Sequence, residues 1–255
     1  MEQDSKHLVK IIYPLYTPKL TAYERMSLEH NIQMLAAYPQ VLLIPQDTCA
    51  DDYHTTLPAL RQCETMYVPS ENLGANGIEG YNRMMLSEDF YKRFDDCEYI
   101  LICQADTWIF NDCLEEWCQR GFDYIGAPWW RRGIWSWPII RLFVAGNRRL
   151  YGKVGNGGLS LRRIPAFIEV CQKQRKRINL YLKHKHHIFN EDVFWAIEPK
   201  NFRYPSMREA VRFSFDSHPD KCLAMNKRLP FGCHGWFKKD RLPFWNAYIL
   251  PQRHD

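Results

Sequence analysis

Four short polar motifs in this chain have the residue types and spacing to do chemistry. The first is Gln104-Ala105-Asp106, which follows the apolar run 99–103 and precedes the apolar residues 108–110. A carboxylate between two apolar segments is costly unless a cation meets it, and a divalent metal that bridges a diphosphate would do so. The alternative is a helix cap, because aspartate is favoured just before a helix.

A glycine-rich segment and an acidic pair are the next two motifs. The segment 155–158 (Gly-Asn-Gly-Gly) precedes an alternating apolar strand at 159–162. Such glycines either let the backbone approach a ligand closely or form a tight turn or bulge. Glu191 and Asp192 open an apolar helix. There they either complement the helix dipole or supply a general base, with one carboxylate taking a proton while the other is held by hydrogen bonds.

The fourth motif is His234, within the segment 230–236 (Pro-Phe-Gly-Cys-His-Gly-Trp). The glycines around it allow a ligand to approach the imidazole, which favours a ligand-binding role. A purely structural histidine is the alternative.

Hydrophobic patterning predicts the elements that position these motifs. Strands are predicted at 9–13, 41–44, 66–68, 99–103 and 123–126, and helices at 23–37, 81–94 and 111–119, with a glycine-bearing loop at 74–80. This alternation indicates an α/β fold with a mostly parallel sheet covered on both faces. Ligands of such sheets bind beyond the carboxyl ends of the strands, which points to Gln104, Asp106 and the segment 13–17.

Length and composition narrow the class of protein. The 255 residues suit one α/β domain, and 46% hydrophobic with 25% charged residues suit a packed core. The net charge of +5 fits an anionic ligand or lipid surface and is too small to indicate a nucleic-acid partner. The nine cysteines favour reduced interior residues over a zinc site, because no ligand spacing matches. No apolar run is long enough to span a membrane, and residues 1–10 lack a secretory signal, so we expect a cytoplasmic protein.

The segment 129–153 has a character of its own, because tryptophans and aliphatic residues alternate there with arginines. Such a mixture is typical of a peripheral contact with an anionic membrane, here at its inner face. The alternative is an insertion that packs on the protein's own core or forms a dimer interface.

Together the motifs resemble the GT-A glycosyltransferase superfamily. The ordered set that carries the resemblance is Gln104-Ala105-Asp106, Gly155-Asn156-Gly157-Gly158-Leu159-Ser160-Leu161-Arg162, Glu191-Asp192-Val193 and Phe231-Gly232-Cys233-His234-Gly235-Trp236. The chain is most similar to a bacterial branch described as a domain of unknown function with presumed glycosyltransferase activity. The resemblance implies one GT-A-like catalytic domain over 1–255, with a Rossmann-like, mixed and mostly parallel sheet flanked by helices.

The resemblance also implies a metal and donor site. Asp106 resembles the second acid of the superfamily's Asp-x-Asp motif, which binds Mn²⁺ or Mg²⁺ on the nucleotide diphosphate. His234 resembles the late histidine that adds a metal ligand. Gln104 stands in place of the first acid, and its amide can still bind a ribose or a metal-bound water. Gly157 and Gly158 are similar to the loop under the donor sugar.

Further contacts with the nucleotide follow from the same resemblance. Asn82 and Arg83 open the helix before the key strand, where family members contact the nucleotide. Tyr13, Tyr16 and Thr17 lie in the segment that matches the first-strand loop around the base.

The implied activity is transfer of a sugar from a nucleotide-sugar to a hydroxyl of a glycan or lipid-linked acceptor. The donor would be UDP-linked, as is usual in the family, and the product would belong to surface polysaccharide or glycoconjugate synthesis. Glu191 or Asp192 would act as the base of a single inverting displacement. One alternative is a sugar nucleotidyltransferase, although the segment 13–17 lacks the glycine-rich basic loop typical of that class. Another is a non-catalytic carbohydrate- or nucleotide-binding protein on a transferase scaffold, which the departure at Gln104 keeps open.

Overall fold

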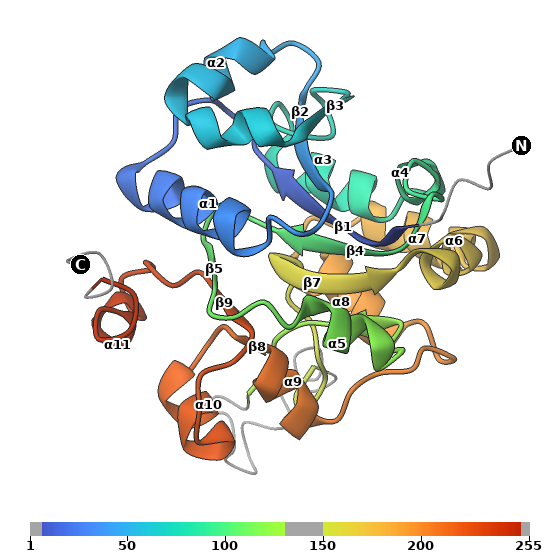
Figure 1. The fold of residues 1–255 in the computed structure, drawn as a ribbon. Helices are drawn as coiled ribbons and strands as arrows, with labels where there is room; N and C mark the ends of the chain where they lie inside the picture. The colour runs from blue at the N-terminus through green and yellow to red at the C-terminus, as the bar shows by residue number, and fades with distance from the viewer. Residues whose placement is uncertain (1–6, 131–149, 251–255) are drawn as a thin grey trace, which may run out of the picture.

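A six-stranded sheet with the strand order β3-β2-β1-β4-β7-β6 runs through the centre of the protein (Figure 1). The computed structural model describes residues 7–130 and 150–250. The strands of this sheet are β1 (His7–Pro14), β2 (Gln40–Pro45), β3 (Glu64–Val68), β4 (Cys97–Cys103), β6 (Tyr124–Ile125) and β7 (Leu159–Arg163). Strands β1 to β4 are parallel, whereas β7 is antiparallel to both β4 and β6.

Successive residues of the buried strands point to opposite sides of the central sheet, so that both of its faces are apolar. Helices cover both faces. The first half of the chain contributes α1 (Ala22–Met34), α2 (Ala50–Thr56), the 3₁₀ helix η1 (Pro58–Gln62), α3 (Gly77–Met85), α4 (Glu88–Lys92) and α5 (Leu114–Gln119). The second half contributes α6 (Ile164–Lys173), α7 (Arg175–Leu182), the 3₁₀ helix η5 (His187–Phe189) and α8 (Glu191–Ile197).

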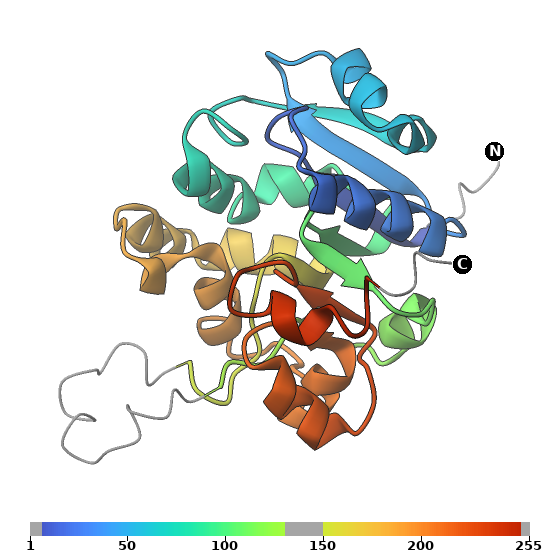
Figure 2. The same ribbon diagram turned by 90° about the vertical axis from the view of Figure 1, so that its left-hand side faces the viewer.

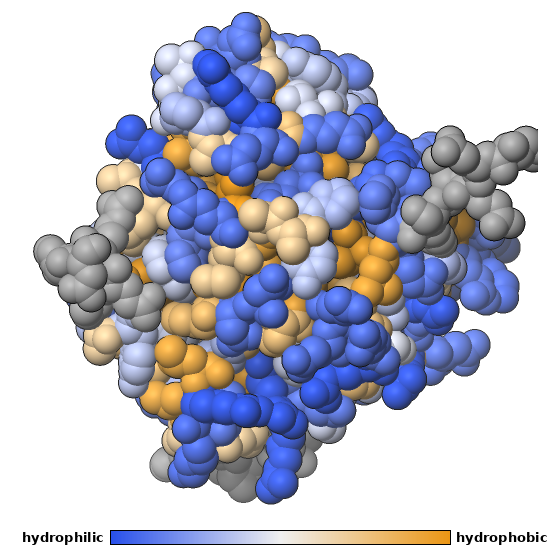
Figure 3. Space-filling model, viewed as in Figure 1, coloured by the Kyte–Doolittle hydropathy of each residue, from blue (hydrophilic) through white to orange (hydrophobic). Residues whose placement is uncertain are grey.

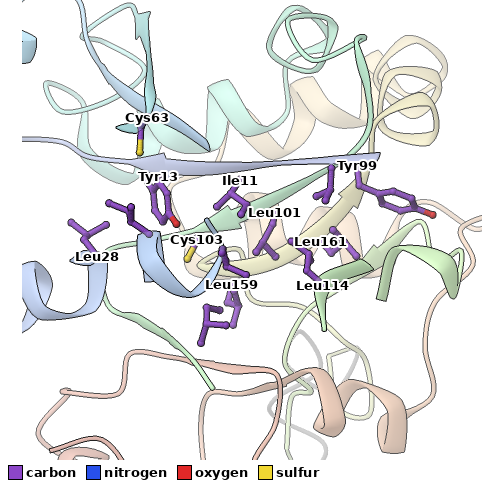
Figure 4. Close-up of a cluster of buried hydrophobic side chains, with 14 of the residues drawn as sticks. Ile11, Tyr13, Leu28, Cys63, Tyr99, Leu101, Cys103, Leu114, Leu159 and Leu161 are labelled. Carbon is purple, nitrogen blue, oxygen red and sulfur yellow. The ribbon is translucent and has the colours of Figure 1, made fainter. Parts of the chain in front are cut away.

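One face of the sheet packs against α1, α2, η1 and α5. Ile11 of β1, Leu101 of β4 and Leu161 of β7 meet Leu28 of α1 and Leu114 of α5 in this layer (Figure 4). The neighbouring strand residues Ile12, Ile100 and Ile102 point the other way and pack against α3, α4, α6, α7 and α8. The strands are therefore buried on both sides, as expected for a parallel sheet with helices on both faces.

A smaller sheet lies beside the first, and the helices of the chain after residue 206 pack around it. It contains β5 (Thr107–Ile109), β9 (Gly232–His234) and β8 (Ser214–Phe215) in that order. The helices α9 (Met207–Phe213), α10 (Pro219–Asn226) and α11 (Leu242–Trp245) follow in the same region. These C-terminal elements, orange to red, gather on the side of the molecule away from α2 (Figure 2). Trp108, Trp236 and Trp245 are buried in their core.

The surface in the view of Figure 3 shows apolar residues as separate patches among hydrophilic ones. Among the described residues, no helix is long and apolar enough to cross a membrane. The segment 129–153 lies mostly outside the described residues, because only Trp129, Trp130 and residues 150–153 of it are described.

The predicted α/β architecture, with a mostly parallel sheet covered on both faces, is confirmed. Two details differ. The helix predicted at 81–94 is two helices, α3 and α4, and the loop predicted at 74–80 already contains the first turn of α3. The break is stabilised because the carbonyl of Met85 accepts hydrogen bonds from the Tyr91 hydroxyl at 2.7 Å and from the Trp195 indole at 3.0 Å. Those side chains come from elements that no local pattern could connect to residue 85.

Candidate active site

Strand β4 of the central sheet leads into β5 of the small sheet (Figure 1). Asp106 lies in the turn between these two strands. Strand β4 ends at Cys103, and strand β5 starts at Thr107 and pairs with β9, so that Thr107 lies opposite His234. The amide of Gly235 donates to the carbonyl of Asp106 at 2.8 Å. This pairing brings Asp106 and His234 together across more than a hundred residues of sequence. A strand follows Asp106, and therefore the helix-cap alternative is wrong.

The imidazole of His234 lies at the centre of a polar cluster. Its Nε2 lies 3.1 Å from Oδ1 of Asp106 and 3.3 Å from Oε1 of Gln104. Its Nδ1 lies 3.6 Å from Oδ1 of Asp216, which follows β8. Nζ of Lys238 lies 3.8 Å from Oδ2 of Asp106. Two predicted site residues far apart in sequence, Asp106 and His234, therefore share one cluster with the amide of Gln104.

The charges of this cluster depend on each other. Burial opposes protonation of His234, but the carboxylates of Asp106 and Asp216 outweigh it and raise the His234 pKa to about 9. Burial also opposes ionisation of Asp106, yet His234 and Lys238 lower the Asp106 pKa to about 2. Arg241 forms an ion pair with Asp216 and keeps that carboxylate in place behind the imidazole. Without a ligand the cluster thus pairs an ionised Asp106 with a protonated His234.

The glycine segment packs directly on these side chains. A Cβ atom on Gly158 would lie 2.1 Å from Nε2 of His234, and one on Gly157 would lie 2.1 Å from Oε1 of Glu191. Real Cβ atoms essentially never approach a neighbour within 3.0 Å. The glycines are therefore required for close approach of the backbone to two functional side chains. The Gly157–Gly158 loop separates the His234 cluster from the acidic pair and touches both.

The two members of the acidic pair have different environments. Glu191 is 3% exposed, and its Oε1 accepts a hydrogen bond from Arg162 at 3.1 Å. Asp192 is half-buried, and its Oδ1 accepts a bond from the amide of Val193 at 2.8 Å. Burial and then the charge of Glu191 raise the Asp192 pKa to about 7. Asp192 can therefore exchange a proton near neutral pH, whereas Glu191 is committed to Arg162.

The predicted nucleotide contacts lie in three different places. Tyr16 and Thr17 line a pocket of about 250 Å³, together with residues that include Pro14, Lys19, Gln104, Asp106 and Phe237. Tyr13 does not reach this pocket, because its side chain is fully buried between β1 and α1 in the core (Figure 4). The burial of Tyr13 contradicts the prediction that its side chain touches the base.

Asn82 and Arg83 lie apart from that pocket. The Asn82 side chain accepts a hydrogen bond from the amide of Glu191 at 3.0 Å and donates one to Asn190 at 3.1 Å. Asn82 thereby caps α8 and orients the acidic pair. Arg83 lines a separate hollow of about 60 Å³ between α3 and the end of α7. The structure thus connects Asn82 with the base candidates and not with the pocket beside Asp106.

Four residues of the site were not predicted from the sequence to have a role in it, namely Arg162, Asp216, Lys238 and Arg241. Arg162 shares its face of β7 with Ser160 and alternates with Leu159 and Leu161, so the strand pattern gave no sign that this side chain is buried. Lys238 follows His234 by four residues, but only the positive-φ turn at Gly235 returns it to Asp106. Asp216 and Arg241 carried no signal of their own.

The side chains around Asp106 can bind a divalent metal only if a bound nucleotide and water supply some of the metal's ligands. Within residues 7–130 and 150–250, no group of three His, Cys, Asp or Glu side chains is arranged to hold a metal ion. One carboxylate oxygen, one imidazole nitrogen and one amide oxygen do converge, from Asp106, His234 and Gln104. Mn²⁺ and Mg²⁺ accept such a set when diphosphate oxygens and waters complete it. The donor set is compatible with a metal that arrives with a nucleotide.

Comparison with known proteins places the chain in a family. Residues 62–234 match the family model described as "Protein of unknown function (DUF5672)". No curated protein matches the chain.

Solved structures match the fold over almost the full length. A galactosyltransferase, LgtC in complex with donor and acceptor sugar analogues, matches with a TM-score of 0.61 at 11% identity, over 95% of this chain and 94% of that chain. Mouse xyloside xylosyltransferase 1 in its apo form matches with a TM-score of 0.56 at 12% identity, over 92% of this chain and 98% of that chain. The chain belongs to the DUF5672 family, and its fold is that of the GT-A glycosyltransferases.

Proposed function

We propose that the protein is a glycosyltransferase that moves a sugar from a nucleotide-sugar to an acceptor hydroxyl. The observation that carries this proposal is the position of the Gly157–Gly158 loop. On one side it touches His234, which meets Asp106, and on the other it touches Glu191, next to Asp192. One stretch of backbone thus contacts both the cluster proposed to bind the diphosphate and the first residue of the helix that carries the proposed base. The fold shared with a galactosyltransferase and a xylosyltransferase supports this arrangement.

On this proposal the donor nucleotide enters the pocket beside Asp106. Tyr16 and Thr17 would contact the base, and the diphosphate would lie over Asp106, Gln104 and His234. Asp106, His234 and Gln104 would hold a divalent metal there, which would supply positive charge against the leaving diphosphate. Lys238, 3.8 Å from Asp106, adds a second positive charge at the same place.

Asp192 is the side chain we propose as the base. It is half-buried and follows Glu191, which contacts Gly157, and its pKa of about 7 suits a group that takes a proton from a sugar hydroxyl at neutral pH. Glu191, which the sequence left as an equal candidate, is occupied by Arg162. A single base on the acceptor side implies a single displacement with inversion at the anomeric carbon.

The finer assignments remain proposals of the same kind. We propose a UDP-linked hexose as donor and a glycan or lipid-linked acceptor, in surface polysaccharide or glycoconjugate synthesis. A lipid-linked acceptor fits the mixed aromatic and basic composition of 129–153, which suits the cytoplasmic side of a membrane.

Isothermal titration with UDP, with and without Mn²⁺, tests the proposed function. The wild type should bind UDP more tightly with Mn²⁺, and Asp106→Asn and His234→Ala should lose that difference. Asp51→Asn, which changes an exposed aspartate of α2, is the matched control and should behave as wild type. If the wild type binds no nucleotide, a non-catalytic scaffold is the better interpretation.

A further inference from the structure

Arg162 is a charged side chain that lies entirely inside the protein, with 0% of it exposed. It stands on β7, directly beneath the Gly157–Gly158 loop. Its Nε donates to Oγ of Ser160 at 3.0 Å, one guanidinium nitrogen donates to the Tyr91 hydroxyl at 2.9 Å, and the other donates to Glu191 at 3.1 Å. A buried guanidinium is costly unless its donors are satisfied, and here three separate elements satisfy them.

The partners of Arg162 connect it to both halves of the candidate site. Oγ of Ser160 donates to the carbonyl of Gly157 at 3.2 Å, which ties the guanidinium to the loop. Glu191 is the first residue of α8, and its Oε1 lies against Gly157. One planar group therefore sets the distance between the loop and the helix end that carries Asp192. The planar guanidinium of an arginine can donate hydrogen bonds in several fixed directions at once, whereas the ammonium of a lysine is a point charge without such geometry.

We infer that Arg162 and Glu191 form a positioning pair, in which their buried ion pair holds the Gly157–Gly158 loop against the end of α8 that carries Asp192. This inference rests on the proposed function and deepens it, because it separates the two acids into a base and a positioning residue. Neither member of the pair needs to touch substrate.

The charged and titratable groups that act on Asp192 come from four elements. Glu191 is adjacent on α8, and Arg162 of β7, Tyr124 of β6 and Asp216 after β8 interact with Asp192 electrostatically. Glu191 raises the pKa of Asp192 and Arg162 lowers it. Charge and geometry can therefore be changed separately. Glu191→Gln removes the negative charge and keeps an amide oxygen that can accept from Arg162. Arg162→Lys keeps the positive charge and removes the planar guanidinium.

The kinetic experiment measures kcat, KM and the pH profile of sugar transfer for these two variants. Glu191→Gln should keep kcat within about tenfold and move the acid limb of the profile to lower pH, because the base loses a neighbouring negative charge. Arg162→Lys should leave the acid limb in place and raise the donor KM at least tenfold, as loss of a supporting residue typically does. Loss of the acid limb in Glu191→Gln would make Glu191 the base and overturn the inference.

Hydrogen exchange of the backbone provides a readout that does not need activity. Amides at 155–158 and at the start of α8 should exchange at least about tenfold faster in Arg162→Lys. Arg163→Lys is the matched control, because Arg163 is the next residue of β7, lies on the opposite face of the sheet and pairs with Glu98 and Asp123. Equal exchange in both variants would overturn the positioning role. Absence of any transfer by the wild type would refute only the proposed function.

Discussion

Gly158→Ala tests the contact between the glycine loop and His234 with a single added methyl group. The new Cβ would lie 2.1 Å from Nε2, 2.3 Å from Cδ2 and 2.6 Å from Cε1 of the imidazole, and ordinary contact begins at 3.4 Å. Asp106 and Asp216 hold the ring on both nitrogens, so it cannot rotate freely. Either the ring or the loop must move by more than about 1 Å, and a misplacement of that size costs about a hundredfold in a positioned reaction.

We therefore expect the transfer rate and the affinity for UDP with Mn²⁺ to fall about a hundredfold, which corresponds to about 3 kcal/mol. The measurements are initial rates and isothermal titration, with a thermal melt to show that the variant folds. Gly152→Ala is the control, because a Cβ there meets nothing within 4 Å although its φ of +78° adds backbone strain. Binding by Gly158→Ala within threefold of wild type would refute the placement of His234 in the nucleotide site.

Three further predictions concern single side chains. The transfer rate should rise about tenfold per pH unit up to the Asp192 pKa of about 7 and then level off, because the base acts only when ionised. Asp192→Asn should lower kcat at least a hundredfold and abolish this rise of the rate with pH. Asp216→Asn should lower the pKa of His234 in the metal-free protein from about 9, as NMR titration of the imidazole would show. Thr21→Ala should cost about 1 kcal/mol in denaturant unfolding, because it removes the capping box with Glu24 at the start of α1.

The main elements of the fold could be predicted from sequence because their signals are local. The strands β1, β2 and β4 are built around the apolar runs 11–13, 41–44 and 99–103, and α1 starts at a capping box. The antiparallel direction of β7 could not be predicted, because residues 159–163 have the same alternation in either direction and the choice depends on the chain's path before them. The split of the helix at Met85 depends on side chains from Tyr91 and Trp195 in the same way.

The candidate site was only partly predictable, for a related reason. Asp106 and His234 each have a local signal, a polar residue at a strand end and a histidine between glycines. Their pairing follows from the register of β5 on β9, which the sequence does not show. Tyr13 shows how a local signal can mislead. It lies at the carboxyl end of the strand predicted at 9–13, where ligands are expected, yet strand alternation turns its side chain into the core.

The role of Glu191 depended on burial rather than on residue type. Two adjacent acids at a helix start are equivalent in sequence, and only the guanidinium of Arg162 distinguishes them. Since that arginine is 29 residues away on β7, the asymmetry is a property of the folded chain.

The central claim is that this protein transfers sugar from a nucleotide-sugar through the Asp106–His234 cluster. Hydrolysis of a panel of common nucleotide-sugars, with and without Mn²⁺, tests it most directly, because slow hydrolysis of the donor needs no acceptor. The account predicts release of the nucleoside diphosphate from at least one donor by the wild type, stimulation by Mn²⁺, and loss in Asp106→Asn with Asp51→Asn unaffected. Release of no nucleoside diphosphate from any donor, or equal release by wild type and Asp106→Asn, would contradict it.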